Sequence, residues 1–335
     1  MPALPQPPAL SSRARRRLRR AAAVTVAVLA LAGLRSLVGA VTAAPTVGSF
    51  TSSEGRREYA AAYQVAMRRL PAPTATHDLV TGYGTVRAYE WLTPETAATA
   101  PVLLVPGRSS GVPMWADNLP GLSAGRRVIA LDALGDAGLS VQSVPLASMA
   151  DQAAWIDEVV QQLAPGGVHV VGHSFGGATA AAYARHYPHR VRSLVLLEPV
   201  FTFGYPPAST FLWASIGSAS WLPQSWREPA LARIGGVEYD PSEPTAQLVA
   251  AGAQHYSAAL PTPSPLTKAE IAVLTMPVYL GLGGDQSLSG SDAAAQAAAL
   301  PRGTVETWPG ATHSLPMQAA EPLAQRLAGF WSAAD

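Results

Sequence analysis

The chain has 335 residues, of which 48% are hydrophobic and 13% are charged, so its length allows one large domain or two small ones and its composition excludes disorder for most of it. The net charge of +1 is uneven, because seven of the 23 basic residues occur up to Arg35 and the first acidic residue is Glu54. The rest of the chain carries 16 basic and 22 acidic residues, a balance that argues against nucleic-acid binding.

The N-terminus predicts an export signal. An Arg-rich stretch precedes the uncharged run 21–34, which is shorter than the roughly 20 apolar residues of a spanning helix but typical of a secretory signal. Small residues at 41–43 predict cleavage before Ala44. The alternative is an uncleaved anchor that extends to Ala44, in which inserting Arg35 into the membrane costs about 2.5–3.5 kcal/mol of free energy. We expect residues 1–44 to be an export signal or anchor, with the export route open, and expect no other membrane contact.

Cysteine is absent from the sequence. This excludes a disulfide framework, a thiol nucleophile and a Cys-ligated zinc site. A chain without thiols is compatible with an oxidising compartment, which agrees with export.

The segment after the signal predicts a helix and then an edge hairpin. Residues 51–70 place apolar side chains at helical spacing and end before Pro71. Two β-rich runs, 79–83 and 86–92, are separated by Gly84, as in a hairpin at a sheet edge.

The following segments alternate between short apolar runs, typical of buried parallel strands, and patterns typical of helices. The expected strands are 101–105, 127–131, 168–171 and 191–197, and the expected helices lie near 114–122, 148–163 and 175–187. Ser148 and Asp151 have the spacing of a capping box. Such alternation predicts an α/β fold with a doubly wound, mostly parallel sheet.

An aromatic and proline-rich stretch, 201–275, interrupts this alternation and predicts an inserted helical cap. Alternation then resumes with a strand at 278–282, a helix from about Asp292, a strand near 305–308 and a last helix at about 317–331. The sheet would therefore be built from 45–200 and 276–335.

Gly172-His173-Ser174-Phe175-Gly176 follows an expected strand and opens an expected helix, which is the setting of a nucleophile elbow. Such a turn is strained and exposes the Ser174 hydroxyl, while Gly172 and Gly176 let the strand and helix approach closely. The Phe175 N–H at the helix N-terminus would face a developing oxyanion.

A serine nucleophile needs a base and an orienting acid. In α/β folds with such a nucleophile turn, the three residues occur along the chain in the order serine, acid, histidine. His313 follows the short strand at 305–308 and is the expected base. Asp285 follows the strand at 278–282 and is the expected acid, with Glu198, at the end of the strand 191–197, as the main rival and Asp292 as another.

A second oxyanion donor is expected in the loop after Val105, where the Arg108 N–H is the candidate among small residues. The Arg108 guanidinium could instead contact a substrate carboxylate or a cap carbonyl. Asp132 and Asp136 end another expected strand, where they would cap a loop or contact substrate.

These residues make the chain similar to serine hydrolases of the α/β-hydrolase superfamily over about residues 51–335. Met114-Trp115 with Asn118 and the stretch 131–140 resemble a capped, esterase-like bacterial subgroup. The resemblance implies Ser174 as nucleophile, His313 as base and Asp285 as acid. Pro106-Gly107 stands where the family often has His-Gly, which affects the Arg108 assignment most.

The expected function is hydrolysis of a small-molecule carboxylic ester with an apolar moiety through an acyl-enzyme, without a metal or organic cofactor. Thioester, lactone, amide or carbon–carbon bond hydrolysis uses the same catalytic groups and remains an alternative. So does a non-catalytic ligand-binding protein with this fold. The sequence leaves the substrate, the mobility of the cap and the oligomeric state open.

Overall fold

Parallel strands form the centre of the fold in the computed structural model, which describes residues 46–334. The described strands are β1 (Ser49–Phe50), β2 (Ala75–Thr81), β3 (Gly84–Trp91), β4 (Val102–Val105), β5 (Val128–Leu131), β6 (Val141–Gln142), β7 (Val168–His173), β8 (Val191–Leu197), β9 (Tyr256–Ser257), β10 (Val278–Gly283) and β11 (Gly303–Trp308). Those of the main sheet run in the order β11-β10-β8-β7-β4-β5-β3-β2, with β6 pairing with β3. The β2–β3 hairpin is antiparallel and lies at one edge, as predicted.

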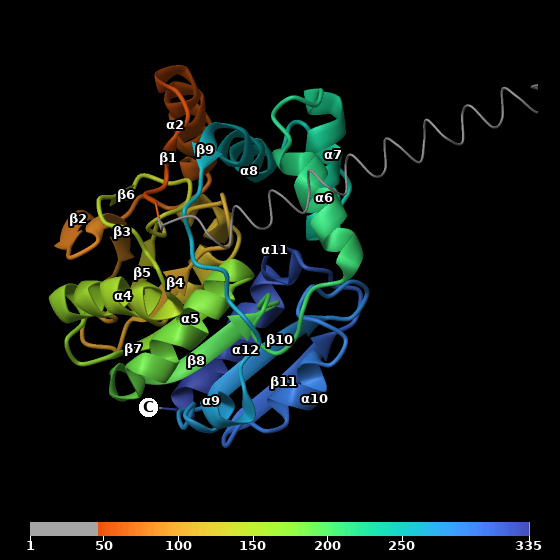
Figure 1. Cartoon of the computed structure of the whole chain (residues 1–335). Coiled ribbons are helices and arrows are strands. Elements are labelled where there is room, and N and C mark those ends of the chain that lie inside the picture. The colour runs from red at the N-terminus through yellow and green to blue at the C-terminus, as the bar shows by residue number, and fades with distance from the viewer. Residues whose placement is uncertain (1–45, 335) are drawn as a thin grey trace, which may run out of the picture. The chain divides into compact units, whose positions relative to one another are not determined.

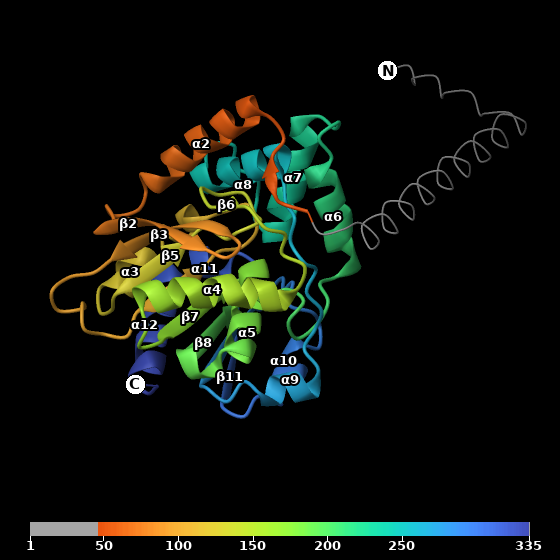
Figure 2. The same cartoon turned by 60° about the vertical axis from the view of Figure 1, so that its left-hand side comes forward.

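The described helices cover both faces of this sheet (Figures 1 and 2). The α-helices are α2 (Ser53–Met67), α3 (Leu119–Ser123), α4 (Met149–Leu163), α5 (Phe175–His186), α6 (Ala208–Ser218), α7 (Gln224–Gly235), α8 (Pro244–His255), α9 (Lys268–Ala272), α10 (Ala293–Ala297), α11 (Leu315–Gln318) and α12 (Ala320–Ser332), and the 3-10 turns are η1 (Val112–Trp115) and η2 (Pro188–Arg190). The helix expected near 114–122 is thus split into η1 and α3, and the last helix into α11 and α12.

Two buried apolar clusters hold these layers together. Trp155 and Ile156 of α4 and Tyr183 of α5 belong to the cluster on one face of the sheet. Trp115 of η1 and Trp331 of α12 belong to the cluster on the other face. The predicted capping box is present, since the Ser148 hydroxyl accepts the Asp151 N–H and the Asp151 side chain accepts the Ser148 N–H. This satisfies donors that the first turn of α4 otherwise leaves unpaired.

Helices α6 to α9 and strand β9 fill the chain between β8 and β10, so an inserted helical region is present. This region is tied to the start of the described chain. β9 pairs with β1 in an antiparallel register, and α8 packs against α2. The His255 Nε2 atom lies 2.7 Å from a Glu58 carboxylate oxygen. The segment before the sheet therefore supports the inserted helices.

The expected export signal or anchor, residues 1–44, lies outside the described residues. Among residues 46–334, no helix has both the length and the apolar character that crossing a membrane requires.

Candidate active site

The carboxyl ends of β4, β7, β8 and β10 meet at one edge of the sheet. In the parallel register, Val105 pairs with Gly172, His173 with Leu197, and Leu197 with Gly281. The residues that follow these strands are therefore brought together although they are far apart in sequence. This edge is where open α/β sheets bind ligands.

Ser174 occupies a strained turn between β7 and α5. Its φ of 55° and ψ of −123° lie in a region that residues with a side chain rarely adopt. A Cβ on Gly172 would lie 2.4 Å from the Gly176 carbonyl oxygen, and a Cβ on Gly176 would lie 2.3 Å from that of Pro106. Glycine at both positions therefore permits the close approach of strand and helix that the sequence predicts.

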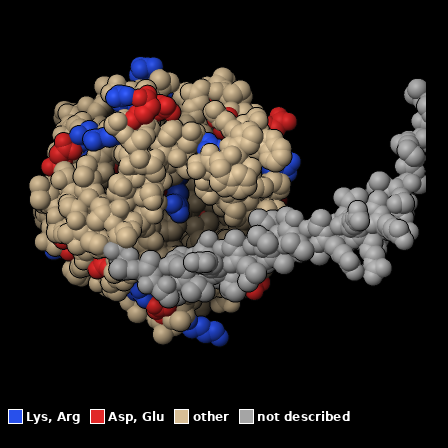
Figure 3. Space-filling model, turned by 45° about the horizontal axis from the view of Figure 1, so that its top comes forward, with Lys and Arg blue, Asp and Glu red and all other residues tan. Residues whose placement is uncertain are grey.

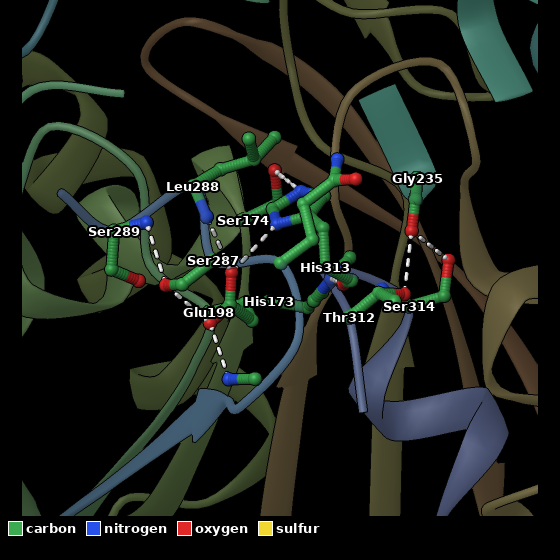
Figure 4. A network of polar contacts seen from close by, with 12 residues as sticks. His173, Ser174, Glu198, Gly235, Ser287, Leu288, Ser289, Thr312, His313 and Ser314 are labelled. Carbon is green, nitrogen blue, oxygen red and sulfur yellow. Dashed lines mark hydrogen bonds and ion pairs between the residues drawn. The ribbon is translucent and has the colours of Figure 1, made fainter. Parts of the chain in front are cut away.

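His313 lies in the loop after β11, with 6% of its surface exposed. Its Nε2 atom is 2.8 Å from the Ser174 Oγ (Figure 4). The Ser174 hydroxyl can donate to this nitrogen if the other ring nitrogen, Nδ1, carries the proton. The predicted nucleophile and base are thus within hydrogen-bond distance.

The acid beside the imidazole is Glu198. Its Oε2 atom lies 3.2 Å from the His313 Nδ1 atom. Asp285 is exposed, and its backbone N–H donates to the Ala311 carbonyl oxygen. The prediction that Asp285 orients His313 is therefore wrong for this structure, which places the rival Glu198 there. Asp292 lies at the N-cap position of α10, where its Oδ1 atom accepts a hydrogen bond from the Ser291 hydroxyl.

Glu198 can lie buried beside His313 because the loop after β10 donates hydrogen bonds to its carboxylate. The Glu198 carboxylate has no exposed surface and accepts the Gly283 N–H at 2.7 Å, the Ser287 hydroxyl at 2.7 Å and the Leu288 N–H at 2.8 Å. Figure 4 shows these donors around the carboxylate. A buried carboxylate is tolerated when its oxygens are hydrogen-bonded. Sequence reasoning missed Ser287 and these backbone donors, since no residue pattern marks a backbone N–H as a ligand.

His173 positions the His313 loop without contacting Ser174 through its ring. Its Nε2–H donates to the His313 carbonyl oxygen at 2.9 Å, and its buried Nδ1 has no hydrogen-bond partner. Burial, together with the neighbouring His313, lowers the pKa of His173 to about 3. The ring is therefore neutral at neutral pH, with its proton on Nε2.

This buried histidine should make stability depend on pH. Between pH 3 and the ordinary pKa of 6.5, the unfolded chain binds a proton that the folded chain does not, so the free energy of unfolding falls as the pH falls. Between pH 7.5 and 4.5, we expect the free energy of unfolding of the wild-type protein to fall by about 3 kcal/mol more than that of His173→Gln. Urea unfolding of both proteins measures this; a constant difference between them would contradict it.

The loop after β4, residues 106–111, lies against the Ser174 turn. A Cβ on Gly107 would lie 3.3 Å from the Ser174 Cβ. The Arg108 side chain is exposed, with its guanidinium 5.8 Å from the centre of the Phe175 ring. Within the described chain, no hydrogen bond uses the Arg108 or Phe175 N–H, so both candidate oxyanion donors are available to a ligand.

Two buried aspartates fix this loop, which supports the loop-capping role considered for them. Asp136 accepts the Ser109 N–H at 2.8 Å, where Ser109 has a φ of 59°. Asp132 accepts the Val112 N–H at 2.8 Å and the Tyr63 hydroxyl at 3.2 Å. Burial raises the pKa of Asp132 to about 6.

Asp136→Ala should therefore lower kcat by about 10- to 100-fold with little change in KM, because the Arg108 N–H would lose its fixed orientation toward a transition-state oxyanion. Steady-state kinetics on a soluble ester tests this, with Asp240→Ala at an exposed position of the inserted region as control. Equal effects of the two substitutions would contradict it.

A cavity with a volume of about 630 Å³ lies in the inserted region. Side chains of α6 and α7 line it, apolar ones such as Trp213 beside polar and charged ones such as Arg233. Leu288, the residue whose N–H binds Glu198, also belongs to the lining. The Thr312 and Ser314 hydroxyls beside His313 both donate to the Gly235 carbonyl oxygen at the end of α7. Hydrogen bonds thus connect the loop of His313 and the Glu198 carboxylate to segments that line the cavity. Figure 3 shows a hollowed face with one basic side chain in the hollow.

Comparison with known proteins agrees with this geometry. The family model described as alpha/beta hydrolase fold matches residues 100–233. The 2-hydroxy-6-oxo-2,4-heptadienoate hydrolase of Pseudomonas putida is 38% identical over 112 residues, 32% of this chain and 40% of that protein. Carboxylesterase YbfK of Bacillus subtilis is 29% identical over 102 residues, 30% of this chain and 34% of that protein. These alignments thus span less than half of the curated relatives' length.

Solved structures are similar over most of the chain. The crystal structure of carboxylesterase CesB (YbfK) from Bacillus subtilis has a TM-score of 0.76 at 22% identity and covers 83% of this chain and 98% of that one. Naproxen esterase from the same organism has a TM-score of 0.74 at 20% identity and covers 84% and 99%. At this identity the likeness shows the fold. The sheet order, the inserted helices, the family match over residues 100–233 and these structures together show that the chain has the alpha/beta hydrolase fold.

Proposed function

We propose that this hydrolase cleaves a carboxylic ester through an acyl-enzyme. The observation that carries the proposal is the chain of contacts from the Ser174 Oγ to the His313 Nε2 at 2.8 Å and from the His313 Nδ1 to Glu198 at 3.2 Å. Nucleophile, base and orienting acid are thus arranged as acyl transfer requires. Similarity to two carboxylesterases of Bacillus subtilis supports the ester as substrate.

In the proposed reaction, Ser174 attacks the ester carbonyl while His313 takes the hydroxyl proton. The Phe175 and Arg108 N–H groups stabilise the oxyanion. The alcohol leaves with the proton from His313, and water, deprotonated by His313, then attacks the acyl group. Collapse of this second intermediate releases the carboxylic acid and returns the proton to Ser174. The Glu198 carboxylate accepts the Nδ1–H of His313 and so keeps that proton on Nδ1.

The substrate is proposed to carry an apolar group. The cavity of about 630 Å³ beside the Glu198 loop has the size of a small-molecule site. Apolar Trp213, Ile234 and Leu288 share its lining with the charged side chains of Arg233 and Glu238. Longer acyl or alcohol chains should therefore be accepted.

The testing experiment combines a fluorophosphonate probe with a series of nitrophenyl esters of increasing acyl length. We expect one probe per chain, located at Ser174 by peptide mass spectrometry, and turnover of the esters. A folded protein that neither reacts with the probe nor cleaves any ester would refute the proposal.

Hydrolysis of a carbon–carbon bond is the second candidate, because the heptadienoate hydrolase of Pseudomonas putida is 38% identical in the aligned region. The loss of absorbance of 2-hydroxy-6-oxo-2,4-heptadienoate, measured beside the ester series, separates the two. A higher kcat/KM for the dienoate than for every ester would favour this candidate.

We also propose that the protein is exported, on the pattern of residues 13–44. Cell fractionation of the full chain and sequencing of its mature N-terminus test this. A start near Ala44 outside the cytoplasm is the expected result, and an intact N-terminus in the cytoplasm would contradict export.

A further inference from the structure

A surface of exposed aromatic side chains lies on the inserted region. All aromatic side chains that are exposed in residues 46–334 fall within 205–226. The aromatic surface consists of Tyr205, Phe211, Leu212, Trp221 and Trp226, which are 63%, 50%, 56%, 81% and 64% exposed. Soluble proteins normally bury such side chains, and Trp221 and Trp226 are the most costly to leave in water.

The members of this surface lie on neighbouring segments of the inserted region. The Phe201 ring contacts both the Tyr205 ring, at 6.1 Å between centroids, and the Phe211 ring, at 6.2 Å. Phe211 and Leu212 belong to α6, Trp226 belongs to α7, and these two helices pack against each other. The exposed side chains are thus carried by one helical hairpin and the loops beside it, and α6 and α7 lie together in both views (Figures 1 and 2).

This hairpin is also free of charge over a long stretch. No Asp, Glu, Lys, Arg or His occurs between Glu198 and Arg227, and Arg227 itself is 3% exposed. A protein-binding surface commonly includes Arg and has a polar, charged rim. An uncharged surface of Trp, Tyr, Phe and Leu instead matches the boundary between lipid headgroups and acyl chains, where Trp and Tyr are enriched.

We propose that the aromatic surface docks the protein onto an uncharged lipid surface. Because residues 199–226, which carry the exposed aromatic side chains, bring no charge to the contact, binding needs no anionic lipid and changes little with salt. The apolar run at residues 21–34 independently predicts that the chain contacts a membrane during export or through an anchor. The proposal concerns a surface and does not depend on the reaction at Ser174.

The absence of cysteine from the sequence allows a site-specific test in the full chain. Ser220→Cys, at an exposed position beside Trp221, carries a polarity-sensitive fluorophore. Ala295→Cys, exposed on α10, carries the same label as the matched control. Each protein is mixed with phosphatidylcholine vesicles, with and without phosphatidylserine and at low and high salt.

We expect a blue shift of the Ser220 label on phosphatidylcholine alone, little changed by phosphatidylserine or salt, and no shift of the control label. The double substitution Trp221→Ser and Trp226→Ser in the labelled protein should weaken vesicle binding, measured by this blue shift, by about tenfold or more. Both positions are exposed, so circular dichroism should show an unchanged fold. Hydrolysis of a short soluble ester should be unchanged in the same variant.

Three results would overturn the proposal. The first is vesicle binding without a shift at Ser220, which would place the contact elsewhere in the chain. The second is a shift that needs phosphatidylserine and disappears with salt. The third is a shift that rises with protein concentration when no vesicles are present, which would assign the surface to a second copy of the chain. Failure of the proposed esterase activity would leave all of these fluorescence results unaffected.

Discussion

Ser174→Ala is expected to lower kcat for ester hydrolysis by about 10⁶-fold. The substitution removes the only atom that His313 can activate at 2.8 Å, so the acyl-enzyme cannot form. Alanine is smaller than serine, and the left-handed turn that holds position 174 accepts a Cβ already, so the fold should persist. Initial rates on a nitrophenyl ester and labelling by the fluorophosphonate measure the effect.

Ser215→Ala is the matched control, because Ser215 is exposed on α6 and its hydroxyl bonds only to the Phe211 carbonyl oxygen. Its rate should stay within about twofold of wild type. Residual labelling of Ser174→Ala at the wild-type rate would show that another group is the nucleophile. If Ser174→Ala lost ester cleavage but retained cleavage of the dienoate, ester hydrolysis and carbon–carbon bond hydrolysis would not share the same nucleophile.

Glu198→Gln should lower kcat by about 10⁴-fold, whereas Asp285→Asn should stay within about twofold of wild type. Glutamine presents an N–H₂ group to donors that now bond a carboxylate, and it favours the His313 tautomer with the proton on Nε2, which cannot accept from Ser174. Asp285 is exposed and does not contact His313, so its charge has little effect. Kinetics and thermal unfolding of both variants provide the test.

Thermal unfolding is needed because Glu198 is buried and its loss can weaken the fold as well as the reaction. A folded Glu198→Gln protein with a pH profile of kcat like that of wild type would count against Glu198 as the orienting acid. A large loss in Asp285→Asn with normal activity in Glu198→Gln would reverse the assignment made from the structure.

The identity of the acid that orients His313 could not be predicted from the residue pattern. Glu198 and Asp285 both follow apolar strands, and the residue pattern gives them equivalent positions. What separates them is the course of the loop after β10, which turns its Gly283 and Leu288 N–H groups toward Glu198 and leaves Asp285 exposed. Strand patterns predict where a strand ends but carry no information on how the following loop turns.

The helices show the same division. The capped helix α4 begins after Ser148 as predicted, because capping and apolar spacing are local properties. The helix expected near 114–122 is instead η1 and α3, because Pro120 has no N–H for the interior of a continuous helix but is tolerated in the first turn of α3. The support of α8 by α2 could not be predicted, since it joins segments about 190 residues apart whose patterns show only that each has an apolar face.

The sheet-forming alternation, the nucleophile turn at Ser174 and the loop position of His313 could be predicted from the residues, because they depend on local spacing, glycine geometry and strand order. The tertiary structure decided which carboxylate lies against His313, how Asp136 holds the loop beside Ser174, and which aromatic side chains of the inserted region stay exposed. Each of these depends on contacts between distant segments, whose relative placement is fixed only when the parallel strands and the helices on both faces pack together.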